Sequence, residues 1–161
     1  MSWVDIYGRN SSYGFAPETW AQVKKMAKDR LIRNLRNPRV IVTTYGELVD
    51  HSRPTIDFGT PRNAVFHGLL GQISDDEEEQ GRGLLSALVV HSQDGRPGIG
   101  FFDGAANWGR DVSDRDKCWT QEVDRLAPRQ SAAIVRRRFR QARSEARTCV
   151  ACFDTGCRLY R

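Results

Sequence analysis

The residues of this chain that could carry acid–base or nucleophilic chemistry are few and widely separated. His67 and His91 are two of its three histidines, and together they could act as a general acid and base. Ser86 could be a nucleophile only with a base beside it, and no Gly-x-Ser-x-Gly pattern surrounds it. The spacing of these residues therefore gives no complete catalytic set.

Metal-dependent nuclease chemistry would need carboxylates that converge on one cation. The acidic candidates are Asp103, Glu122 and Asp124, and Lys117 stands apart from them. No pattern places an acid and a lysine on adjacent strands. A nuclease stays open as an alternative function, but the sequence favours a protein without catalytic activity.

Three of the four cysteines, Cys149, Cys152 and Cys157, lie close together near the end of the chain. The gap between Cys149 and Cys152 is that of a zinc knuckle, but tetrahedral zinc would need a fourth ligand, such as Cys118, from elsewhere. We expect no cofactor and favour free thiols. A structural zinc is the alternative.

Positive charge is concentrated at the C-terminal end. The chain has a net charge of +5, and residues 128–161 hold nine arginines against two acidic residues. A basic block of this kind suits a polyanion, most commonly nucleic acid. We predict a basic helix over 130–147 whose Arg136, Arg137 and Arg140 contact DNA phosphates. An acidic protein is the alternative partner.

The sequence gives no sign of membrane association. No apolar run approaches the roughly 18–20 residues of a membrane span. The first ten residues, MSWVDIYGRN, lack the basic and apolar regions of a secretory signal, and the basic helix has too small an apolar side for a lipid surface. We therefore expect a cytoplasmic protein with no membrane partner.

The elements that must position these residues follow from periodicity. Residues 1–16 are expected to form an irregular arm. Trp20, Val23, Ala27 and Leu31 recur at helical spacing after Pro17, which predicts an amphipathic helix over 17–36. A β-branched run predicts a strand over 40–45, and a short helix over 46–49 follows.

The second half of the pattern predicts a helix and then a hairpin. Thr60 and Pro61 resemble an N-cap and a first-turn residue, so we expect a helix over 61–73, followed by a solvated acidic run over 75–79. A buried strand over 84–90, a turn over 93–98 and a returning strand over 99–102 would complete the hairpin. A further helix is predicted over 115–126.

The order strand, short helix, loop, helix, hairpin is that of a winged helix, whose second helix enters the major groove. Three segments carry a family resemblance: TTYGEL at 43–48, PRNAV at 61–65, and LLSALVV at 84–90 followed by glycines at 95, 98 and 100. Together they resemble the DNA-binding domain of the O6-alkylguanine-DNA alkyltransferase family over about 60 residues. Where that family has Pro-Cys-His-Arg, this chain has Leu85-Ser86-Ala87-Leu88, so alkyl transfer is not expected.

The resemblance implies a set of DNA contacts. Tyr45 corresponds to a tyrosine that contacts DNA, although packing in the core is an equal alternative. Arg62 and Asn63 would lie in the first turn of the recognition helix, where a bidentate contact to guanine or adenine contributes about 1–3 kcal/mol. Capping of that helix is the alternative for both. His67 lies on the same helix, and Arg96 would meet phosphate at the tip of the wing.

These observations predict an α+β fold: a winged-helix-like core with a short β-hairpin wing, an N-terminal amphipathic helix and C-terminal helices. The expected units are an arm over 1–16, a winged-helix-like domain over 17–127 and a basic, cysteine-containing tail over 128–161. We expect a non-enzymatic protein of a bacterial or phage-like genome that binds double-stranded DNA. The alternatives are a structural or protein-interaction subunit of a bacterial complex and the metal-dependent nuclease.

Overall fold

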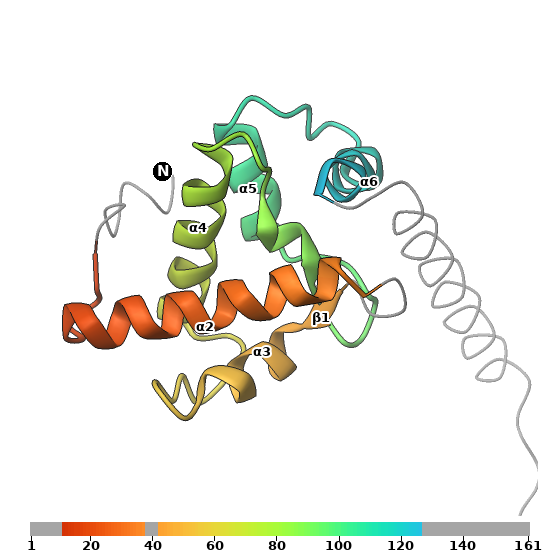
Figure 1. The fold of residues 1–161 in the computed structure, drawn as a ribbon. Helices are drawn as coiled ribbons and strands as arrows, with labels where there is room; N and C mark the ends of the chain where they lie inside the picture. Colours follow the sequence, from red (N-terminus) through yellow and green to blue (C-terminus); the bar gives the residue numbers. More distant parts are fainter. Residues whose placement is uncertain (1–10, 38–41, 127–161) are drawn as a thin grey trace, which may run out of the picture.

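The computed structural model describes residues 11–37 and 42–126, which form a helix-rich α+β fold (Figure 1). Its elements are α2 (Pro17–Leu35), β1 (Thr43–Thr44), α3 (Tyr45–Ser52), α4 (Ala64–Glu78), the 3-10 helix η1 (Leu85–Leu88), β2 (Val89–Val90), α5 (Ile99–Asn107) and α6 (Arg115–Leu126). Helix α2 lies across the domain and packs on α3, α4 and η1. None of the helices in this part of the chain is both long and apolar enough to cross a bilayer.

The amphipathic helix predicted over 17–36 is confirmed as α2. Pro17 occupies its first turn, and Trp20, Val23, Ala27 and Leu31 are buried along one side. The Trp20 indole also donates a hydrogen bond of 2.9 Å to Oε1 of Gln72 on α4. This bond satisfies a buried polar pair and fixes where α2 crosses α4.

The predicted strand over 40–45 is shorter in the structure, because a helix begins at Tyr45. Thr44 and Glu47 form a capping box in which each side chain accepts a hydrogen bond from the other residue's backbone N–H. The remaining strand residues, Thr43 and Thr44, pair in parallel with Val89 and Val90. This pairing joins two segments far apart in sequence and sets α3 beside the end of η1.

The segment 84–90 is mostly not a strand, contrary to the prediction. Residues 85–88 form η1, and only Val89 and Val90 are extended. Helix η1 packs against α2, α4, α6 and β2, so its apolar residues are enclosed from several directions. The Ala87 carbonyl accepts a 2.8 Å hydrogen bond from the Trp119 indole, which ties α6 to η1.

The returning strand of the wing, predicted over 99–102, is wrong as well. These residues begin α5, and the described residues contain no antiparallel hairpin. Phe101, Phe102 and Ala105 are buried whereas Ile99 is exposed, a spacing that suits one side of a helix and not a strand. The preceding turn is confirmed, with the His91 N–H donating to the Arg96 carbonyl at 2.8 Å.

The acidic run over 75–79 is not a solvated segment. It lies at the end of α4, and Glu77 is only 2% exposed. Its carboxylate pairs with Lys28 of α2 and with Arg82, whose Nε and Nη2 lie 2.6 and 2.7 Å away. These cations hold the pKa of Glu77 at about 2. Three acids of the run, Asp76, Glu77 and Glu78, are thus paired with cations within the domain.

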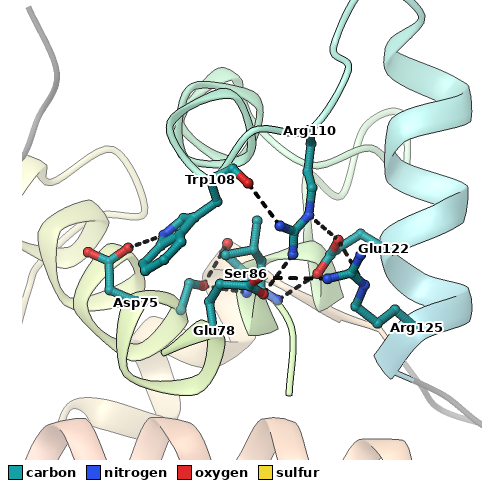
Figure 2. Close-up of polar contacts among 9 residues, drawn as sticks. Asp75, Glu78, Ser86, Trp108, Arg110, Glu122 and Arg125 are labelled. Atoms are coloured by element: carbon teal, nitrogen blue, oxygen red, sulfur yellow. Dashed lines mark hydrogen bonds and ion pairs between the residues drawn. The ribbon is translucent and has the colours of Figure 1, made fainter. Parts of the chain in front are cut away.

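A second group of buried charges links α4 to α6 (Figure 2). Arg110 lies between two carboxylates, with its Nη2 2.7 Å from Glu78 and its Nε 3.2 Å from Glu122. Glu122 also accepts a 2.7 Å hydrogen bond from the backbone N–H of Leu84. The group is a structural tie, because each carboxylate faces an arginine or a backbone donor.

Candidate nucleic-acid interface

The entry to α4 is fixed by Asn63, not by Thr60 as predicted. The Asn63 Oδ1 accepts from the Val65 N–H at 2.8 Å, and its Nδ2 donates to the Phe58 carbonyl at 2.9 Å. Thr60 instead accepts from the Arg62 N–H at 3.0 Å in the turn before the helix. The helix therefore begins at Ala64, and the Asn63 side chain is engaged in holding its first turn.

The first two turns of α4 are open to solvent on one side. Arg62, Ala64 and His67 are exposed, whereas Phe66 and Leu69 face the core. Ala64 and His67 are three residues apart and share one face of the helix, and Arg62 lies in the turn directly before it; these three exposed residues are called the α4 stripe. Because Ala64 is small, this stripe allows close approach of another molecule to the helix, with Arg62 at its leading end.

A cavity of about 450 Å³ opens beside this stripe, in the size range of small-ligand sites. Its apolar wall includes Leu70, Ile99 and Phe101. Its polar lining comes from α3, α4, η1, the 91–98 turn and α5, and consists of Tyr45, Arg62, His67, Ser86, His91 and Asp103. Residues that are far apart in sequence thus meet on one concave surface next to the exposed end of α4.

Tyr45 lies at the back of this cavity and is only 5% exposed. Its hydroxyl accepts a 3.0 Å hydrogen bond from the Gly98 N–H, and burial raises its pKa although that bond opposes the rise. A Cβ at Gly98 would lie 3.0 Å from the Tyr45 hydroxyl oxygen, so glycine permits this close approach. Tyr45 therefore helps to form the core and the cavity wall, and reaches a bound molecule only through the cavity.

The two histidines considered as an acid–base pair are brought together around Tyr45. The ring centroids of His67 and His91 lie 5.4 and 4.7 Å from that of Tyr45. Desolvation in the cavity lowers the pKa of His67, a hydrogen bond to the Pro61 backbone opposes this, and the charge of His91 lowers it further. The sequence did not single out His91 as a binding residue.

Ser86 lines the same cavity but has no activating base among its described contacts. Its backbone N–H donates to the Ser74 hydroxyl and its own hydroxyl accepts from that hydroxyl, both at 2.9 Å. Within residues 11–37 and 42–126, both of these hydrogen bonds of Ser86 go to Ser74, and none joins it to either histidine. The geometry thus supplies no serine nucleophile, because the hydroxyl needs a base to be activated.

The carboxylates considered for a nuclease do not converge. Glu122 is bound to Arg110 and the Leu84 backbone, Asp124 is exposed on α6, and Asp103 lies on the cavity wall. Within residues 11–37 and 42–126, no group of three or more His, Cys, Asp or Glu side chains could hold a metal ion. Glu78 and Glu122 in Figure 2 are neutralised by arginines, which is unlike a cation site.

Several predicted site residues lie elsewhere. Arg96 is half-buried and pairs with Asp116 of α6, at 2.8 Å from its Oδ1, so it does not stand at the tip of a wing. Arg136, Arg137 and Arg140 lie outside the described residues, as do Cys149, Cys152 and Cys157. Cys118 is buried, and burial raises the pKa of its thiol.

We compared the chain with protein-family models, with curated proteins and with solved structures, and none of them matches it. The resemblance to the alkyltransferase DNA-binding domain therefore rests on the three short sequence segments alone.

Proposed function

We propose that this chain is a non-enzymatic protein that binds double-stranded DNA through the leading end of α4. The observation that carries the proposal is the exposed stripe of Arg62, Ala64 and His67 beside a cavity of about 450 Å³. Arg62 ends this stripe with a guanidinium that could bind a guanine edge or a phosphate. In this proposal Asn63 holds the helix entry, and Tyr45 shapes the cavity.

The proposed DNA-binding unit is a variant of the winged helix. It consists of β1, α3, α4, η1 and β2, with the 91–98 turn and the start of α5 in the place where a winged helix has its hairpin. This arrangement supports the proposal because it sets Ile99, which is 56% exposed, on the same cavity as the α4 stripe. In this proposal the start of α4 and the start of α5 approach the duplex together, without a β-hairpin wing.

Charge distribution is compatible with this orientation. The acidic end of α4 near Asp75 lies about 17 Å along the helix from Ala64, about two Debye lengths at physiological salt. Lys24, Lys28 and Arg82 also pair with acids there. We propose that the arginines of residues 128–161 add the sequence-independent part of the affinity.

Fluorescence anisotropy of a labelled duplex, titrated at several salt concentrations, tests the proposal. With five or six arginine–phosphate contacts, the slope of log K against log[salt] should be about −5. Arg62→Ala should weaken binding about tenfold, which corresponds to the lower end of a specific arginine contact. The matched control is Arg53→Ala, because Arg53 is exposed but pairs with Asp50 and Asp57. Absence of binding at low salt, or equal loss in both variants, contradicts the proposal.

A further inference from the structure

The cavity beside α4 concentrates titratable groups that the DNA-binding proposal leaves without a role. His67 and His91 each lie against the Tyr45 ring, and both imidazoles line the cavity. Both are exposed to solvent, so a proton or a small ion can reach them. An imidazole can take up a proton, so two of them on one wall can add positive charge to it.

The charged groups that face this wall are Arg62 at the start of α4 and Asp103 of α5. Tyr45 of α3 is the remaining titratable group, and burial keeps it neutral by raising its pKa. With neutral imidazoles, Arg62 and Asp103 balance in formal charge. With both imidazoles protonated, the lining carries a formal charge of plus two, so acidification turns a balanced cavity into a cationic one.

Hydrogen-bond donors accompany this change in charge. A protonated imidazole has two N–H donors and no acceptor. In His67 one of them is engaged with the Pro61 backbone, which leaves one for a phosphate, and Arg62 adds its guanidinium. The first residues of α5, Ile99 and Gly100, also line the cavity with backbone at a helix start, where N–H groups have no partner within the helix. Donors with positive charge are the groups that bind a phosphate oxyanion.

We propose that Arg62, His67 and His91 form a phosphate-binding site that fills when the two imidazoles are protonated. This inference rests on the proposed function, because the phosphate we assign to the site is a phosphodiester of the bound DNA. Asp103 sets the switch, since its negative charge repels phosphate until both histidines are charged. DNA binding should therefore strengthen as the pH falls below 6.5, because desolvation holds the pKa of His67 below that ordinary value.

The size of the effect follows from proton linkage. Each proton taken up together with the phosphate raises the affinity about tenfold per pH unit while the histidine is still neutral in the free protein. Between pH 6.5 and pH 5.5, DNA affinity of the full chain should thus rise by up to about tenfold for each proton taken up. His67→Gln and His91→Gln should each reduce this rise, and the double variant should abolish it.

His51 supplies the matched control, because it is the third and last histidine of the chain. It lies on α3 away from the cavity, where a hydrogen bond to the Met26 backbone and the charges of Arg30 and Arg33 surround it. His51→Gln should keep the full pH dependence. If this variant loses it, or if the double variant keeps it, the site is refuted.

Nuclear magnetic resonance separates this inference from the proposed function. The histidine ring signals of the full chain are followed while inorganic phosphate, without DNA, is added at pH 5.5 and at pH 7.5. We expect the His67 and His91 signals to move at pH 5.5 only, with the His51 signal unchanged. Phosphate-induced shifts without DNA binding would contradict the proposed function and support the phosphate site. DNA binding with no response of either ring to phosphate or to pH would support the function and contradict the site.

Discussion

Removal of Arg110 should destabilise the fold strongly, because Arg110 neutralises two buried carboxylates. Glu78 and Glu122 retain 10% and 3% of their side-chain exposure, and Arg110 itself retains 16%. Arg110→Met would leave both acids with Arg125 alone, which lies 3.7 Å from Glu78 and 4.0 Å from Glu122 and is half-exposed. Breaking a buried ion pair costs about 3–5 kcal/mol. Since Arg125 remains, we expect Arg110→Met to lower the free energy of unfolding by about 3 kcal/mol, the lower end of this range.

Urea unfolding followed by tryptophan fluorescence measures this cost. With a slope of about 2 kcal/mol per molar urea, the unfolding midpoint should fall by about 1.5 M. Arg53→Met is the matched control: its ion pairs with Asp50 and Asp57 are exposed, so it should cost under about 1 kcal/mol. The double variant Arg110→Met with Glu122→Gln should lose less than the sum of the two single variants, because it removes one buried charge along with its partner.

Equal midpoints for Arg110→Met and Arg53→Met would refute this reasoning. That result would mean that the carboxylates of α4 and α6 reach water once the arginine is gone. It would also remove the structural explanation for the acids in Figure 2 and reopen their use in binding a cation.

Two further predictions concern Glu77 and Gly98. The pKa of Glu77 is about 2 in the folded chain against 4.5 for an unperturbed group. Its ion pairs therefore stabilise the fold fully above about pH 4.5, and this stabilisation is lost as the pH falls toward 2. In an acid titration of the free energy of unfolding, Glu77→Gln should lack about 3 kcal/mol of this pH dependence, and the exposed control Glu79→Gln should retain it. Gly98→Ala should lower the free energy of unfolding by about 1 kcal/mol, because the new Cβ crowds the Tyr45 hydroxyl at 3.0 Å and His91 at 3.2 Å. Gly100→Ala, which meets nothing within 4 Å, should be neutral or stabilising in the same urea titration, and the reverse order of the two alanine variants would contradict the cavity geometry.

The helices with strong local signals could be predicted from the sequence. Trp20 to Leu31 recur at helical spacing in α2, and α6 spans Arg115–Leu126 as expected, since in both the buried side chains follow one helical face. The start of α4 was predicted three residues early. Thr60 and Asn63 are both good caps, and in the structure Asn63 caps the helix by accepting from the Val65 N–H while its amide donates to the Phe58 carbonyl.

Elements that depend on distant partners could not be predicted. Residues 84–90 and 99–102 are apolar runs, which are compatible with strand or helix until their neighbours are known. The acids of α4 have the composition of a solvated segment, but Lys28, Arg82 and Arg110 reach them from other elements. The cavity could not be predicted either, because Tyr45, His67 and His91 come together only when the chain has folded.

The proposed contact surface can be tested most directly by following backbone amide signals of the full chain by nuclear magnetic resonance while a short duplex is added. We expect the largest changes within 62–71 and 98–103, the segments that form the α4 stripe and the adjacent cavity. Changes confined to residues 127–161 would assign DNA binding to the basic tail alone. No change at any amide would contradict DNA binding itself.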